Sequence, residues 1–73
     1  MSEEEMIAAI EAGNITRKLV DALVDFEWEN DPYGVLNEYG YIDDRGVRAK
    51  LRKDARLALE TDPKAVIAYL REE

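Results

Sequence analysis

The chain has 73 residues and a mass of 8.4 kDa, which is enough for one small domain. It contains no cysteine and no histidine, which excludes disulfides, thiolate metal sites and the commonest general base. The net charge is −7, yet apolar residues make up 47% of the chain, and this composition favours a folded core over disorder.

The first helix is predicted from its amino-terminal signal. Ser2 and Glu5 have the spacing of a capping box, and acidic residues suit the positive end of a helix dipole. We therefore expect a helix over residues 3–12 that stops at Gly13. Its apolar residues, at spacings of three and four, are Met6, Ile7 and Ile10.

A second helix follows, with Asn14 as its predicted cap and residues 15–28 as its extent. It carries the clearest helical spacing of apolar residues in the chain, at Ile15, Leu19, Val20, Leu23 and Val24. Beyond Val24 apolar and acidic residues alternate, which is a strand pattern. A lone strand would be marginal, so we keep the helix and expect it to fray near Trp28.

Aspartate followed by proline is a strong restart signal, and it occurs first at Asp31-Pro32. A short third helix should run over residues 32–39. Asp43-Asp44 should then cap a fourth helix over residues 45–60. The residues of this helix that should point inward are Val47, Leu51, Ala55 and Ala58.

The restart signal recurs at Asp62-Pro63 and predicts a fifth helix. This helix carries its apolar residues at Val66, Ile67 and Leu70. The predicted fold class is all-α, a compact bundle of four to five short helices in a single domain over residues 1–73.

Charge is distributed unevenly along the chain. Residues 1–44 carry twelve acidic residues against two basic ones, a net charge of −10. Residues 45–73 carry eight basic residues against five acidic ones, a net charge of +3. Either acidic and basic helices pack together or face water, or one pole docks on an oppositely charged partner.

No motif for catalysis, a cofactor or a metal ion is present. A calcium-binding loop needs glycine at position six and glutamate at position twelve. Neither the register that starts at Asp25 nor the one that starts at Glu29 meets both requirements. The chain also lacks a glycine-rich phosphate loop. We therefore expect no catalytic residue, no cofactor and no metal site, and a protein that is not an enzyme.

The predicted fourth helix resembles a DNA-recognition helix, because its arginines recur at spacings of three and four along one face. They are Arg45, Arg48, Arg52 and Arg56. We expect this face to lie opposite Val47 and Leu51. A net charge of −7 opposes nucleic-acid binding, since phosphate contacts dominate affinity. A nucleic-acid-binding module that uses residues 45–56 is therefore an alternative function.

Aromatic residues gather beside the most acidic stretch of the chain. They are Trp28, Tyr33, Tyr39 and Tyr41. Some should pack in the core, but tryptophan and tyrosine are also enriched at interface hot spots. A segment containing Trp28, Glu29, Asp31 and Tyr33 would suit a basic groove on a partner, and we expect Trp28 and Tyr33 to be the most exposed of the aromatic residues.

A further alternative is an acidic mimic of nucleic acid that inhibits a host DNA-binding or defence protein. It requires carboxylates spaced along one surface, and a partial row is present at Asp21, Asp25 and Glu29. A self-associating structural piece is another hypothesis, which would need a leftover apolar face.

The length, the acidic start Ser2-Glu3-Glu4-Glu5 and the compact helical prediction resemble the small acidic regulators that bacteriophages make against host machinery. Among these is the RNA-polymerase-binding type of antiterminator that a Xanthomonas phage encodes. The resemblance implies binding to host RNA polymerase, displacement of the initiation factor, and antitermination together with an elongation factor. It implies no catalytic residue and matches no motif, so no contact residue is carried over.

The leading hypothesis is thus a small acidic regulator that binds a protein, with bacterial RNA polymerase as the first candidate, to inhibit initiation or promote antitermination. We expect a monomer, with contact to RNA through the basic helix as an option. The candidate partner-binding residues are Trp28, Glu29, Asp31, Tyr33, Arg45, Arg48, Arg52 and Arg56. No apolar run is long enough to cross a membrane and the start is acidic, so we expect a cytoplasmic protein with no membrane contact.

Overall fold

The computed structural model describes residues 1–30 and 44–72, which form four helices joined without any strand in these ranges. This result confirms the predicted all-α bundle. The helices are α1 (Glu3–Glu11), α2 (Arg17–Asn30), α4 (Asp44–Thr61) and α5 (Pro63–Glu72). The predicted helix over residues 32–39 lies outside the described residues.

The capping box predicted for α1 is present. Ser2 Oγ accepts a hydrogen bond from the Glu5 N–H, and the Ser2 N–H donates to Glu5 Oε1, both at 3.1 Å. Two hydrogen bonds with Ser2 lower the pKa of Glu5. The one from the Ser2 backbone has the larger effect, and the one with its side chain has the smaller. Because the folded pKa is lowered, the capping box stabilises α1 near neutral pH and loses this effect as the pH falls through that pKa.

Helix α1 ends in a Schellman motif centred on Gly13, which has a φ of 73°. The Gly13 N–H donates to the Ile10 carbonyl at 3.0 Å, and the Asn14 N–H donates to the Ala9 carbonyl at 2.9 Å. These bonds satisfy two of the carbonyls that the end of a helix leaves without partners.

The structure corrects the start of α2. The predicted cap was Asn14, but the chain there closes α1, and Thr16 caps α2 instead. Thr16 Oγ1 accepts a hydrogen bond from the Leu19 N–H at 3.2 Å. The helix also continues through the alternating acidic and apolar residues to Asn30, whose side-chain Nδ2 donates to the Phe26 carbonyl at 2.8 Å.

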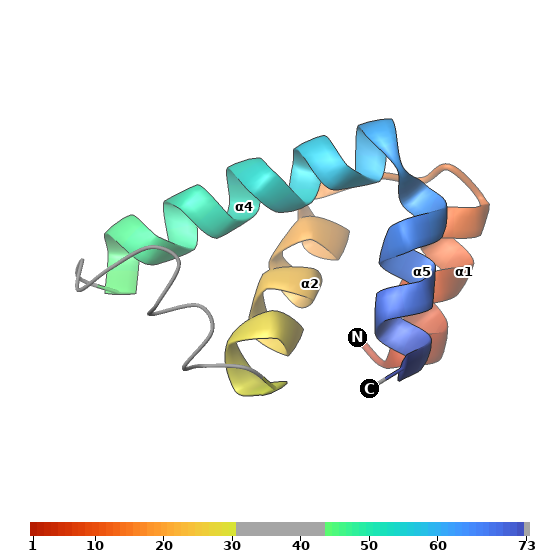
Figure 1. Cartoon of the computed structure of the whole chain (residues 1–73), viewed down its shortest axis with the longest axis horizontal. Coiled ribbons are helices and arrows are strands. Elements are labelled where there is room, and N and C mark those ends of the chain that lie inside the picture. Colours follow the sequence, from red (N-terminus) through yellow and green to blue (C-terminus); the bar gives the residue numbers. More distant parts are fainter. Residues whose placement is uncertain (31–43, 73) are drawn as a thin grey trace.

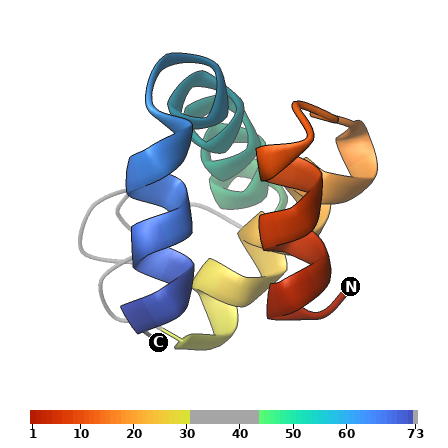
Figure 2. The ribbon, with the colours of Figure 1, turned by 90° about the vertical axis from the view of Figure 1, so that its right-hand side faces the viewer.

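Helices α4 and α5 meet at the predicted Asp62-Pro63 junction. Asp62 Oδ1 accepts a hydrogen bond from the Ala65 N–H at 3.3 Å and caps α5, while Pro63 occupies the first helical position. Figure 1 shows α4 running lengthwise along the top of the molecule, with α1 and α5 side by side at the right. Figure 2 shows the same pair from its outer face.

One hydrophobic core joins the four described helices. Its buried residues are Met6, Ile10, Leu19, Val20, Leu23, Val24, Val47, Leu51, Ala55, Leu59, Val66 and Leu70. Three of the four residues predicted to face inward on α4 are buried. The fourth, Ala58, is half-buried, and Leu59 takes the place in the core because the buried stripe continues at a spacing of four from Ala55. Within the described ranges, no helix is long and apolar enough to cross a membrane.

Candidate functional site

Two carboxylates of α2 bind two arginines of α4. The Arg48 guanidinium contacts Asp25 Oδ1 at 2.6 Å, and Arg52 Nε contacts Asp21 Oδ1 at 3.0 Å. Both pairs follow an i, i+4 spacing on their helices, with the order of α4 reversed relative to α2. We call these four residues the ion-pair ladder. Arg17 Nε also lies 3.8 Å from Asp21 Oδ2.

The ladder agrees with the interpretation in which acidic and basic helices of the chain pack together. Part of the basic stripe of α4 neutralises part of the acidic row of α2 within the chain. Arg48 and Arg52 therefore lie at an edge of the α2–α4 interface, beside the buried Val47 and Leu51. For these two arginines the expected position opposite Val47 and Leu51 is corrected, because their long side chains reach around the edge of the helix contact to a carboxylate, whereas Arg56 is exposed.

Among the other predicted site residues, the structure brings Trp28 together with Arg48. Trp28 is half-buried: it packs against the core, and the Arg48 guanidinium lies over its ring at 5.7 Å from the centroid. Glu29 and Arg56 are exposed. Asp31, Tyr33 and the side chain of Arg45 lie outside the described part of the chain.

The described ranges hold no group of three or more acidic residues, histidines or cysteines that could bind a metal ion. The structure instead contains a cleft of about 480 Å³, which we call the α2–α4–α5 cleft. Its lining residues are Leu23, Glu27, Asp54, Ala55, Ala58, Thr61, Asp62, Ala65, Val66 and Tyr69.

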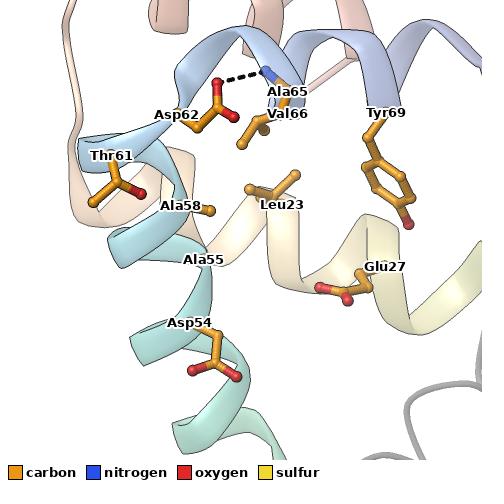
Figure 3. Close-up of a pocket in the computed structure, with 10 residues that line it drawn as sticks. All are labelled: Leu23, Glu27, Asp54, Ala55, Ala58, Thr61, Asp62, Ala65, Val66 and Tyr69. Carbon is orange, nitrogen blue, oxygen red and sulfur yellow. Dashed lines mark hydrogen bonds between the residues drawn. The ribbon is translucent and has the colours of Figure 1, made fainter.

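The cleft exists because the residues that face one another there are small. Ala55 and Ala58 of α4 and Ala65 of α5 each carry only a methyl group, so the two helices leave space beside Leu23 of α2 (Figure 3). Leu23, Ala55 and Val66 belong to the buried core and form an apolar floor. An edge-to-face contact between Phe26 and Tyr69, with ring centroids 5.8 Å apart, connects α2 to α5 beside the cleft.

Carboxylates from three segments surround this floor. Glu27 comes from α2, Asp54 from α4, and Asp62 from the junction before α5 (Figure 3). Asp54 and Asp62 are exposed and Glu27 is half-buried. No lysine or arginine is among the described residues that line the cleft.

The sequence predictions missed the cleft. The one local signal was a pair of alanines, Ala55 and Ala58, on the apolar side of a helix where larger residues fill the neighbouring positions. The contributions of α2 and α5 depend on how the helices pack. Comparison of the chain with protein-family models, with curated proteins and with solved structures finds no match.

Proposed function

We propose that this chain is a small non-enzymatic regulator that binds a protein partner through the α2–α4–α5 cleft. The observation that carries the proposal is the cleft itself, a solvent-accessible space of about 480 Å³ over an apolar floor. This volume lies in the range of roughly 300–1,000 Å³ that is common for small-molecule pockets, so the cleft has room for side chains of a partner. Its polar side chains are three carboxylates, one hydroxyl and one phenol, a set that suits recognition better than nucleophilic chemistry.

Bacterial RNA polymerase is the partner to test first, on the grounds of the resemblance to phage regulators. Binding would inhibit initiation or promote antitermination, and it would place this chain in the cytoplasm. The cleft and the identity of the partner are separate parts of the proposal, since the cleft rests on structure and the partner on resemblance.

The ion-pair ladder weighs against the two alternative functions. An acidic mimic would have to present Asp21 and Asp25 to a basic partner, yet both carboxylates already bind arginines of α4. A nucleic acid that used Arg48 and Arg52 would have to compete with the same contacts. Either function would need the ladder to open, at the cost of its hydrogen bonds.

The cleft is tested with two variants of α5. Ala65→Trp places an indole at the cleft, where it competes with an incoming side chain, while Ala68→Trp adds the same ring to an exposed position that does not line the cleft. Both variants and the unchanged chain are immobilised, and the polymerase that each retains from bacterial lysate is measured by mass spectrometry at moderate salt.

We expect the unchanged chain and Ala68→Trp to retain polymerase, and Ala65→Trp to retain about tenfold less. Equal retention by the two tryptophan variants would show that the cleft is not the interface. Circular dichroism of each variant confirms that it is folded. If no variant retains polymerase, the proposed partner is wrong.

A further inference from the structure

We infer that the α2–α4–α5 cleft accepts a basic amphipathic helix of the partner protein, which inserts apolar side chains over the floor and sets lysines or arginines against the surrounding carboxylates. This inference deepens the proposed function and rests on it, because it names the kind of segment that the cleft binds. Helix-in-groove binding of this kind is a common mode of peptide recognition.

The first argument is charge. Glu27, Asp54 and Asp62 lie on different sides of the cleft, so a cationic segment would find a carboxylate on each side (Figure 3). Asp62 is held in place by the hydrogen bond that caps α5, at 3.3 Å from the Ala65 nitrogen. A segment that carried acidic residues would meet like charges from three directions.

The second argument is the position of the ion-pair ladder. Glu27 lies on the flank of α2 away from Asp21 and Asp25, since residues two positions apart on a helix do not share a face. Asp54 likewise lies across the buried stripe of α4 from Arg48 and Arg52. The ion-pair ladder therefore lies at one edge of the α2–α4 interface, and the cleft with Glu27 and Asp54 lies at the other edge.

The third argument is the apolar surface. Ala58 and Ala65 are small enough to let a side chain of the partner reach the floor. Leu57 does not line the cleft, but it is 58% exposed and lies one turn of α4 from Asp54 and Thr61, which do.

A helical segment fits this site better than an extended one. An extended peptide leaves its backbone N–H and C=O groups in need of partners, which a sheet edge supplies. The described residues contain no strand, and the floor of the cleft consists of apolar side chains. A helix satisfies its own backbone groups and needs only side-chain contacts.

The test uses two synthetic amphipathic peptides of about 18 residues, a length that can form a helix. They share leucines at i, i+3, i+4 and i+7, and their polar positions are lysine in one and glutamate in the other. Each is titrated into the labelled full chain, and binding is followed from the backbone amide signals by NMR. We expect the lysine peptide to shift the amides around the cleft, and Ala65→Trp to weaken it about tenfold.

A pair of charge variants separates local from overall charge. The cleft variant is Glu27→Gln, Asp54→Asn and Asp62→Asn, in which asparagine keeps an acceptor able to cap α5. The matched control is Glu11→Gln, Glu60→Gln and Glu72→Gln, which changes the net charge equally at exposed positions near helix carboxyl ends. The cleft variant should weaken the lysine peptide about tenfold, and the control less than about twofold.

Three results would overturn the inference. The first is that both charge variants weaken binding of the lysine peptide equally. The second is that the glutamate peptide binds at the same amides. The third is a set of concentration-dependent shifts in the free chain that map to the cleft, since these would identify a second copy as its occupant. The lysate experiment separates the two proposals. If Ala65→Trp no longer retains polymerase while the cleft variant still retains it, the cleft binds a protein but not through a basic helix.

Discussion

At the scale of single residues, the ion-pair ladder has more effect on the surface charge than on stability. Asp21 and Asp25 are 45% and 57% exposed as side chains, and Arg52 and Arg48 are 40% and 38% exposed. Ion pairs this accessible to water contribute roughly 0.2–1 kcal/mol each. Their main consequence is that two carboxylates and two arginines already have partners within the chain, so the acidic row and the basic stripe are both shorter as binding surfaces than the sequence suggests.

Charge reversal at Asp25 tests the ladder. Asp25→Lys removes the contact with Arg48 and sets like charges together, whereas Glu29→Lys makes the same change one turn later at another exposed position of α2. We expect Asp25→Lys to lower the free energy of unfolding by about 1 kcal/mol more than Glu29→Lys. Urea denaturation followed by circular dichroism measures this difference.

A second substitution provides the control for this prediction. Adding Arg48→Glu to Asp25→Lys reverses both charges and should recover part of the lost stability. If Asp25→Lys and Glu29→Lys have the same effect, the pair between Asp25 and Arg48 does not form in solution.

At the scale of the helices, the turn between α1 and α2 depends on one backbone conformation. Gly13 has a φ of 73°, a backbone conformation that residues other than glycine rarely adopt. A Cβ atom added there would meet no other atom within 4 Å, so the requirement for glycine comes from the backbone itself and not from crowding. The same turn explains why Asn14 does not cap α2, because its N–H completes the Schellman motif of α1.

Substitution of Gly13 should therefore have a cost that depends on the tolerance of each side chain for the left-handed region. Gly13→Ala should lower stability by about 1–2 kcal/mol, and Gly13→Asn by less, since asparagine adopts this conformation more readily. For a domain of this size, each kcal/mol corresponds to about 4–8 °C in the melting temperature. Thermal unfolding measures both variants, and equal melting temperatures for Gly13→Ala and the unchanged chain would contradict the prediction.

At the scale of the whole molecule, stability comes from a small core shared by the four described helices. Leu51 is 1% exposed and sits at the centre of the buried stripe of α4. A chain of this length has roughly 4–11 kcal/mol of total stability, so a single large loss in the core is a substantial fraction of it. The side of α4 that does not contact the core carries Leu57, which is 58% exposed.

These two leucines form a matched pair on one helix. Leu51→Ala should lower the free energy of unfolding by about 2–5 kcal/mol, through lost apolar burial and the cavity that remains. Leu57→Ala should change it by no more than about 0.5 kcal/mol. Denaturation in urea measures both, and a large loss at Leu57 would mean that this residue is covered in solution.

Most of the fold followed from local patterns. The capping box at Ser2 and Glu5, the glycine stop at Gly13 and the Asp62-Pro63 restart each act within one turn of helix, so a few neighbouring residues are enough to recognise them. The apolar spacing of α2 and α5 likewise identified their buried faces. One prediction was wrong where two local signals competed, at Asn14 and Thr16. Another was incomplete, because the buried stripe of α4 continues to Leu59 beside the half-buried Ala58.

The sequence by itself determined the helices and their apolar faces, because hydrogen bonds and side-chain spacing within a helix involve residues close along the chain. Only the tertiary structure decided which charges meet and where space is left. Asp21 and Arg52 are thirty-one positions apart, and the cleft needs side chains from α2, α4 and α5 at one place. Such contacts depend on how helices pack around a common core, which no single helix specifies.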